Sequence, residues 1–311
     1  MESSLREQWL ILISTPLYVF IIGLEILLTH LHQRKKAYTL KDSLASFYLM
    51  TVNTVIDVLF RVMYVAILQW FFLRAVFHWE NIIAYWIVLL LAEDFVYYWL
   101  HRIDHTIRIL WAVHVTHHSS QQLNFMVGFR SSVFEPMYRF VYFIPLAWFG
   151  FRPLDIIFMY SATQIWGTLV HTEMKVNLGW LEKILVTPSH HRVHHASNVK
   201  YLDKNMGMFL IIWDKLFGTF QKELTSKEYQ PIKYGLTKNI EKPNAINLIF
   251  SEWQQVWKDV FQKGLSFKQR MGYLFGRPGW SHDGSRQTSE QLRAIENTSQ
   301  SLKEEISEIH Y

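Results

Sequence analysis

Residues 101–118 read HRIDHTIRILWAVHVTHH, and residues 190–195 repeat the pattern as HHRVHH. Together with His171, these stretches hold ten of the chain's fifteen histidines within 95 residues. On a helix, positions i, i+3 and i+4 share one face, so each HxxHH box is expected to direct three imidazoles towards one point. Histidine is the commonest nitrogen ligand of transition metals, and the boxes therefore predict a metal centre.

The composition narrows the class of protein around these boxes. The chain has 311 residues and no cysteine, which excludes thiolate ligands, iron–sulfur clusters and disulfides. Half of the residues are hydrophobic and 18% are charged, a mixture that favours long apolar helices joined to polar segments. The net charge is +5, but the basic residues are scattered or flank apolar runs without any nucleic-acid-binding motif. We therefore expect a membrane partner and no nucleic acid.

The apolar runs predict an all-α integral membrane protein, a bundle of about four transmembrane helices with a cytosolic helical cap that holds the histidines. Residues 9–28 form the first predicted span, 44–77 contain the second, and 82–100 form the third. Twenty helical residues reach about 30 Å, roughly one hydrocarbon core. Residues 140–149 and 154–170 predict a shorter hairpin, turned at GFRP.

The charges beside the spans predict an orientation. Arg34, Lys35, Lys36 and Lys41 follow the first span, so the positive-inside rule places this loop in the cytoplasm. The alternation of spans then brings every histidine box to one cytoplasmic cap. The expected location is a multi-pass protein of the inner membrane in a bacterium, or of the endoplasmic reticulum in a eukaryote. Inside the second span, Asp57 and Arg61 lie one helical turn apart and are interpreted as a structural ion pair.

Four segments are expected along the chain. Residues 1–79 hold the N-terminal spans and the basic loop, and 80–220 hold the histidine core with the third span and the hairpin. Residues 221–280 contain an amphipathic stripe at 246–261, typical of a helix that lies in the membrane interface or packs on the cap. Residues 281–311 are interpreted as a polar tail without chemistry.

The number of histidines favours two metal ions. A packed cluster without metal would titrate near pH 6.5 and repel itself, whereas bound metal holds the imidazoles neutral. A catalytic zinc site uses three protein ligands, so eight to ten imidazoles are too many for one such site. His190 and His191 diverge by about 100° on a helix. Spacing favours His191 as a ligand, and leaves open whether His190 is a ligand or a hydrogen-bond donor to one.

Two further side chains are candidates to support the ligands. Asp94 precedes His101 by two helical turns on the same face, and Tyr98 lies between them. Metal-bound imidazoles usually donate their other N–H to a carboxylate or a carbonyl. We therefore expect Asp94, and secondarily Tyr98, to hydrogen-bond to this metal site.

The series HRIDH, HVTHH, an isolated histidine, HRVHH, YLDKNMG and IWDKLFGTF resembles the fatty acid hydroxylase/sterol desaturase superfamily of integral membrane oxygenases. The resemblance covers roughly residues 80–220, and within the superfamily it is strongest for the members that act on alkylglycerols, which are ether lipids. The chain departs from the usual pattern at Met206, where an aromatic residue commonly follows Asn205. The resemblance implies two iron ions, with zinc as a substitute in isolated protein. The ligands that it implies are His101, His105, His114, His117, His118, His171, His191, His194 and His195.

The same resemblance implies that O2 and external electrons are used to hydroxylate a C–H bond of a lipid, such as an ether lipid. Tetrahydrobiopterin supplies the electrons in the alkylglycerol branch, and cytochrome b5 or a similar carrier does so elsewhere. A lipid or sterol desaturase on the same scaffold is the first alternative. A histidine-rich zinc-binding or zinc-transport membrane protein is less favoured, because the boxes lie just past the ends of spans rather than at the midplane. A zinc hydrolase lacks its HExxH motif here.

Overall fold

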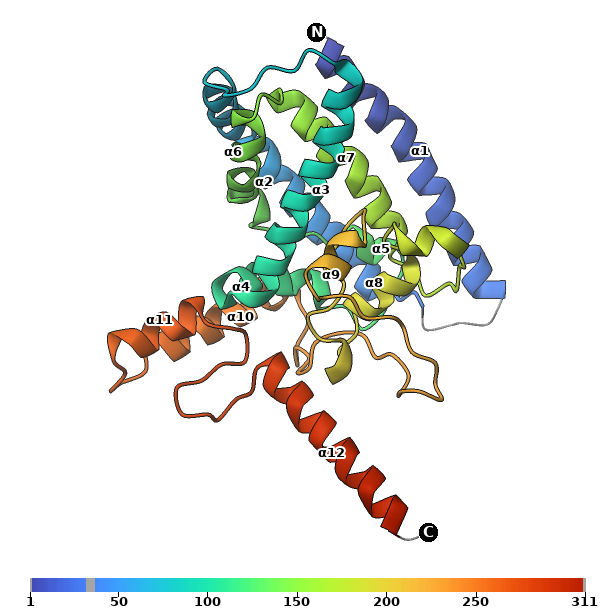
Figure 1. The fold of residues 1–311 in the computed structure, drawn as a ribbon, viewed down its shortest axis with the longest axis vertical. Helices are drawn as coiled ribbons and strands as arrows, with labels where there is room; N and C mark the ends of the chain where they lie inside the picture. Colours follow the sequence, from blue (N-terminus) through green and yellow to red (C-terminus); the bar gives the residue numbers. More distant parts are fainter. Residues whose placement is uncertain (1, 32–36, 310–311) are drawn as a thin grey trace.

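The computed structural model describes residues 2–31 and 37–309. Within them every regular element is a helix, and strand pairing is limited to two isolated bridges, Leu185 with Leu210 and Ala196 with Tyr234. Long helices form a bundle at one end of the molecule, and shorter helices and loops form a cap at the other (Figure 1). The predicted all-helical class is therefore confirmed.

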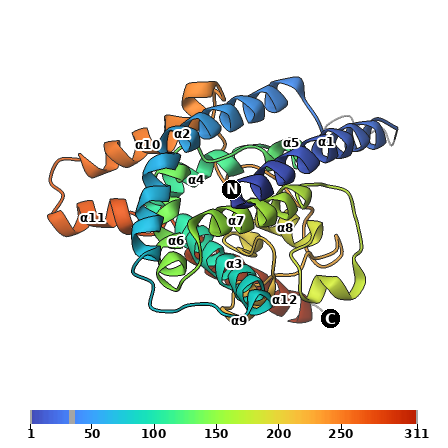
Figure 2. The same cartoon turned by 90° about the horizontal axis from the view of Figure 1, so that it is seen from above.

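Five helices build the bundle: α1 (Glu2–Leu31), α2 (Leu40–Phe72), α3 (Ile82–Thr106), α6 (Arg139–Trp148) and α7 (Pro153–Leu169). α2 and α3 both pack against α6 and α7, and α1 lies along α7 (Figure 2). Among the described residues, α2 and α3 are the two helices long and apolar enough to cross a membrane, and α1 contains a shorter apolar stretch.

The helical hairpin lies where its sequence pattern predicts it. α6 and α7 correspond to the expected ranges 140–149 and 154–170, and each end is shifted by one residue. The turn needs Gly150, which has a φ of +88° and whose added Cβ would overlap the carbonyl oxygen of Phe77. The backbone N–H of Val76 donates to the carbonyl of Trp148 at 2.9 Å, so the hairpin turn is joined to the loop between α2 and α3.

The charged pair predicted in the second span is present, and further charged residues join it. Arg61 Nη2 lies 2.7 Å from Asp57 Oδ2, and Arg139 Nη2 of α6 lies 3.0 Å from Asp57 Oδ1. Arg139 also contacts Glu135 at 3.4 Å. The ion pair is thus part of a network that joins α2 to α6. The basic loop used for the orientation prediction falls largely on residues 32–36, which lie outside the described residues.

The cap is built from α-helices of different lengths and from short 3-10 turns. Its helices are α4 (Arg108–His118), α5 (Phe125–Gly128), α8 (Pro188–His194), α9 (Ile212–Leu216), α10 (Ala245–Val260), α11 (Phe267–Phe275) and α12 (Ser289–Ile309), with 3-10 turns at Glu135–Met137, Gly179–Lys183 and Val199–Tyr201. α10 packs on α4 and α11 (Figure 1). The tail at 281–311 therefore includes a helix, whose start packs on the turn at Val199–Tyr201.

The amphipathic helix predicted at 246–261 is α10, and its stripe divides into two faces. Val256 and Val260 are buried against Ala112 of α4. Trp257 and Phe261 are exposed on the other side. One face of the helix thus packs on the cap, while the other face is apolar and exposed.

Candidate metal centre

Four segments that are distant in sequence bring nine histidines together. The last two turns of α3 carry His101 and His105, and α4 carries the HVTHH box. His171 follows α7 directly, and α8 carries the third box with His195 as its C-cap residue. Every one of these nine side chains is buried or nearly so. The bundle therefore ends in a layer of imidazoles enclosed by the cap.

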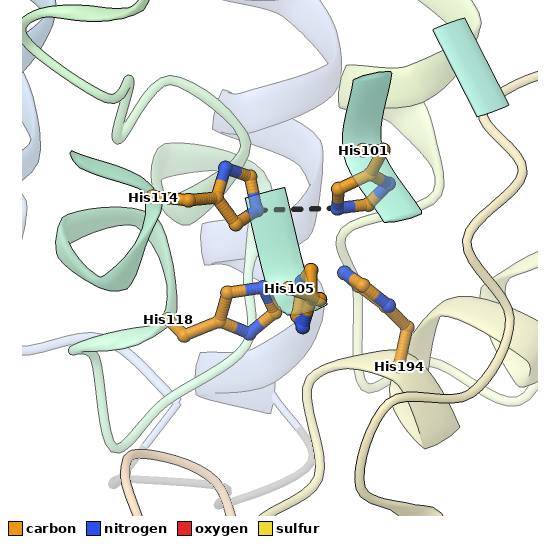
Figure 3. A group of neighbouring side chains, drawn as sticks. All are labelled: His101, His105, His114, His118 and His194. Carbon is orange, nitrogen blue, oxygen red and sulfur yellow. Dashed lines mark hydrogen bonds between the residues drawn. The ribbon is translucent and has the colours of Figure 1, made fainter. Parts of the chain in front are cut away.

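The nine imidazoles form two adjacent groups, and each group could hold a metal ion. The first contains His101, His105, His114, His118 and His194 (Figure 3), and the second contains His117, His171, His191 and His195. Within each group the ligand nitrogens all lie within 4.8 Å of one another. The groups touch, because the rings of His118 and His195 stack with centroids 4.5 Å apart.

The boxes differ from the sequence expectation in one respect. Each HxxHH box was expected to direct three imidazoles at one point, but each box is shared between the groups. His114 and His118 join the first group while His117 joins the second. His190, which the sequence left open, belongs to neither group, and its Nδ1 lies 3.3 Å from the backbone nitrogen of Thr187.

Backbone carbonyls fix the protonation of the second group. His171 Nδ1 lies 2.7 Å from the carbonyl oxygen of Gly167, and His117 Nδ1 lies 2.9 Å from that of Arg130. A carbonyl oxygen only accepts, so each Nδ1 carries the proton and each Nε2 presents a lone pair. The two Nε2 atoms lie 3.3 Å apart. Two facing lone pairs repel each other unless a cation lies between them, so this group fits a metal ion.

The first group has the same construction. His101 Nδ1 contacts the carbonyl oxygen of Met206 at 2.8 Å, and His194 Nδ1 contacts that of Lys204 at 3.0 Å. Among the described residues, the buried Nε2 atoms of His105, His118 and His194 have no hydrogen-bond partner. A buried polar atom without a partner is costly, and a shared cation would satisfy all three.

Burial keeps these imidazoles neutral. It lowers the pKa of His117 to about 4, although the carbonyl of Arg130 acts in the opposite direction. Burial is also the largest cause that lowers the pKa of the other cap histidines well below the usual value, namely His114, His118, His171, His191, His194 and His195. At neutral pH the rings are therefore in the form that binds metal.

Asp94 does not have the expected partner. Its oxygens accept from the backbone N–H groups of Phe209 at 3.0 Å and Leu210 at 3.1 Å, and from Trp213 Nε1 at 2.9 Å. Asp94 thus holds the segment that follows Met206 rather than an imidazole. Tyr98 likewise points away from the histidines, because its hydroxyl contacts Thr219 Oγ1 at 2.9 Å.

The sequence missed the residue that positions the Met206 carbonyl. Asp214, which is fully buried, accepts from the backbone N–H groups of Met206 at 2.7 Å and Gly207 at 2.8 Å. Asn205, with a φ of +55°, donates from Nδ2 to the carbonyls of His190 at 2.9 Å and Gln221 at 2.8 Å. Both lie in the quoted YLDKNMG and IWDKLFGTF stretches, but residue spacing alone contains no signal for these contacts.

A cavity of about 390 Å³ reaches the histidines from the bundle. His114 and His117 line it at one end. Asn53 of α2 lies at the same end of the cavity. Its Nδ2 donates to the carbonyl of Ser132 at 2.7 Å. The hydroxyl of Ser132 in turn lies 3.3 Å from His114 Nδ1. Leu68 lines the cavity four helical turns further along α2, about 22 Å away at the rise of a helix.

The cavity changes character along that length. Near the histidines its wall includes Ser131 and Glu135, and at the far end it includes Leu68, Phe143 and Ile157 of the apolar bundle core. Between these ends the wall carries the charged side chains of Asp57, Arg61 and Arg139. The cavity is thus amphiphilic, polar from the candidate metal centre as far as Arg61 and apolar beyond it.

Residues 86–219 match the family described as Fatty acid hydroxylase. The matched residues contain both histidine groups. Among individual proteins, the chain is 33% identical to human alkylglycerol monooxygenase over 276 residues, which cover 86% of this chain and 59% of the human protein. The chain therefore spans less than two thirds of that relative. The superfamily resemblance read from the histidine boxes is confirmed.

Other relatives carry different names. The chain is 34% identical over 140 residues to an ornithine lipid hydroxylase of Rhizobium tropici, with 44% of this chain and 42% of that protein covered. It is 26% identical over 172 residues to a Delta(7)-sterol 5(6)-desaturase of Gibberella zeae, with 53% and 49% covered. No solved structure matches the chain.

Proposed function

We propose that this chain is a membrane-bound oxygenase that hydroxylates a C–H bond of a lipid with O2 and external electrons. The observation that carries the proposal is the pair of buried histidine groups, whose unprotonated nitrogens face one another at the polar end of an amphiphilic cavity. An ether lipid of the alkylglycerol kind is the first candidate substrate, because the relative matched over most of the chain is an alkylglycerol monooxygenase.

We assign the two groups to two iron ions, with zinc as a substitute in isolated protein. The proposed ligands are the nine histidines of the two groups, and His190 is not among them. Iron ions held there would supply the activation of O2 that attack on an unreactive C–H bond requires. The chain itself would hold the rings, bind the lipid and exclude water.

The backbone carbonyls of Arg130, Gly167, Lys204 and Met206 hold four of the rings in place. Each carbonyl accepts a hydrogen bond from Nδ1–H, which fixes the tautomer and directs Nε2 into its group. Asp214 and Asp94 act as positioning residues, because they hold the segment that supplies the Met206 carbonyl. These four rings are thus oriented by backbone groups, which are held in turn by buried side chains.

The cavity would place the substrate. A hydrocarbon chain would lie along Leu68, Phe143 and Ile157, with the polar part of the lipid next to Asn53 and Ser131. Burying the chain in an apolar cavity is favourable by roughly 0.8 kcal/mol per CH₂ group. The carbon next to the polar part would then lie nearest the histidines, and fixing its position is what selects one bond among many similar ones.

We further propose that the protein spans the membrane several times, with the cap on the cytoplasmic side. Support comes from the length and apolar character of α2 and α3, and from the apolar part of α1 that lies along α7. The electron donor would be external, and tetrahydrobiopterin is the first candidate on the similarity to alkylglycerol monooxygenase.

The alternative is a desaturase on the same scaffold, favoured by the likeness to a sterol desaturase. The two reactions begin with the same C–H bond and differ in whether oxygen is delivered or a second hydrogen is lost. The products differ in mass, because hydroxylation adds one oxygen atom and desaturation removes two hydrogen atoms.

The function is tested with purified, iron-loaded protein in lipid nanodiscs that contain an alkylglycerol, a reductant and O2. We expect O2 consumption that depends on both lipid and reductant, and products that together contain one oxygen atom more than the lipid. Hydroxylation of the carbon next to the ether oxygen gives a hemiacetal, which breaks into an aldehyde and glycerol. His117→Ala should remove this activity and lower the bound iron, whereas the control His78→Ala, a change at an exposed loop histidine, should not. Turnover without O2, or full activity in His117→Ala, would overturn the proposal.

A further inference from the structure

A second cavity, of about 290 Å³, reaches the histidines from the cap. Its inner wall consists of His105, His118, His194 and His195, with Trp111 beside them. The first cavity contacts His114 and His117 instead. The candidate metal centre therefore has two entrances lined by different ligands, one among the bundle helices and one in the cap.

The second cavity is lined mainly by cap residues, several of which are charged. Charged side chains line it from α4, from α10 and from the loop before α12, and include Arg108, Glu252 and Arg286. Its outer wall comes from residues 235–238 and 278–292, which are cap segments. A cavity of this size is at the lower end of the range for small-molecule sites, about 300–1,000 Å³. The charged side chains in its wall suit a small polar molecule that can exchange hydrogen bonds with them.

Arg108 supplies an unused hydrogen-bond donor in this wall. The residue is 2% exposed, Nε lies 3.2 Å from Glu252 Oε1, and Nη2 lies 2.6 Å from Asp259 Oδ2. Its buried Nη1 has no hydrogen-bond partner among the described residues. A buried donor of a charged group is costly to leave unpaired. A molecule with a carbonyl or anionic oxygen in the cavity would accept this hydrogen bond.

The reaction proposed above needs such a molecule. Hydroxylation consumes two electrons and two protons, since R–H, O2, two electrons and two protons give R–OH and water. A donor in the second cavity would lie against the histidine rings without displacing lipid from the first. Trp111 lines the same cavity, and its ring centroid lies 5.1 Å from that of His105 and 5.6 Å from that of His118.

We propose that the second cavity binds a small polar two-electron reductant with a ring carbonyl or anionic oxygen, and that Arg108 Nη1 donates to that oxygen. The inference rests on the proposed function, and it adds the place where electrons enter. The reductant is oxidised by two electrons and releases two protons as the lipid and O2 are converted to alcohol and water. Lipid and reductant thus approach one centre from opposite sides.

The test measures binding directly as well as activity. Two reductants with ring oxygens, tetrahydrobiopterin and ascorbate, are titrated calorimetrically into the full-length, iron-loaded protein without O2 or lipid. Arg108→Gln should raise the Kd of the reductant that binds by at least about tenfold, as loss of a charged hydrogen bond predicts. Its KM as electron donor should rise likewise, while the KM for lipid and the bound iron stay unchanged.

Two further variants keep the test decisive if Arg108→Gln does not fold. Leu292→Trp places a large ring into the cavity from the first turn of α12 and should weaken reductant binding in the same way. Arg277→Gln is the matched control, because Arg277 forms an exposed ion pair with Glu290 outside the cavity wall. Arg277→Gln should bind the reductant as the wild type does.

The outcomes separate this inference from the proposed function. Wild-type reductant affinity in Arg108→Gln or Leu292→Trp overturns the inference, as does a change confined to the KM for lipid. Lipid hydroxylation supported only by a protein electron carrier, with neither reductant bound, overturns the inference and leaves the function standing. Reductant binding that is lost in the variants, without lipid oxidation by any donor, supports the site and overturns the function.

Discussion

His117 and His118 are neighbours in sequence but belong to different histidine groups, and the same is true of His194 and His195. Consecutive residues on a helix point about 100° apart, so one box can serve two sites that lie on either side of its face. α4 and α8 each hold part of both groups. The helix face formed by positions i, i+3 and i+4 is therefore wide enough to supply ligands to two sites.

The same divergence gives a prediction for the pair His190 and His191. His191→Ala removes a member of the second group, so the amount of bound metal should fall. The metal affinity of that group should decrease tenfold or more. His190→Ala should retain the wild-type metal content, because its side chain contacts the Thr187 turn, the backbone of Leu185 and the ring of Phe220, and belongs to neither histidine group. Metal analysis of the two purified variants checks this. Equal metal loss in both would show that His190 is a ligand.

At the residue scale, the sequence predicts which histidines gather but not what holds them. The resemblance to the superfamily implied all nine members of the two groups, and spacing favoured His191 over His190. Asp94 was misassigned because a shared helix face was taken for contact, whereas seven residues separate it from His101 by about 10 Å along the axis. The actual partners are backbone carbonyls, such as that of Met206, in loops whose path depends on tertiary contacts. Such partners leave no pattern in a single sequence.

At the element scale, helices were predictable where apolar runs end in strong turn residues. The bounds of α6 and α7 follow from GFRP, and α10 follows from its stripe. The loop from Arg277 to Thr288 and the start of α12 were not assigned any role, because a polar composition resembles a tail. Their contribution to the second cavity comes from tertiary packing, through contacts such as Arg293 Nη1 with the carbonyl of Leu202 at 2.6 Å.

The hairpin turn gives a stability prediction. Gly150→Ala places a Cβ against the carbonyl of Phe77 at a positive φ, and should lower the free energy of unfolding by at least about 1–2 kcal/mol. Gly23→Ala is the control, since nothing lies within 4 Å of its added Cβ and alanine favours a helix. Thermal unfolding in detergent compares them. An unchanged midpoint for Gly150→Ala would mean that the turn does not pack on the loop between α2 and α3.

The exposed face of α10 is expected to lie in the membrane interface. The chain has no cysteine, so Phe261→Cys introduces one labelling site on that face. A fluorophore there should be quenched by nitroxide lipids in nanodiscs, whereas a fluorophore at Lys227→Cys, an exposed site elsewhere on the cap, should be quenched much less. Equal quenching at the two positions would place the apolar face of α10 away from the lipid.

At the scale of the whole molecule, the fold places a helical bundle on one side of the histidine layer and a polar cap on the other (Figure 1). The first cavity opens among bundle helices and the second among cap segments. The sequence predicted the bundle and the cap from apolar runs and box positions. It could not predict the cavities, because their walls combine side chains from segments that lie far apart in the chain.

The orientation of the whole molecule is testable with single cysteines. Glu80 lies in the loop between α2 and α3, at the end of the bundle opposite the cap (Figure 1). A membrane-impermeant maleimide should label Glu80→Cys on intact cells, and should label Lys227→Cys of the cap only after permeabilisation. The reverse pattern would place the histidine cap outside the cytoplasm.

Each of the two histidine groups is expected to hold one metal ion. Metal content per chain after anaerobic purification, combined with X-ray absorption at the iron edge, measures this. We expect two iron ions per chain with coordination dominated by imidazole nitrogen. One ion or none per chain after loading with iron, or coordination without histidine nitrogen, would contradict it.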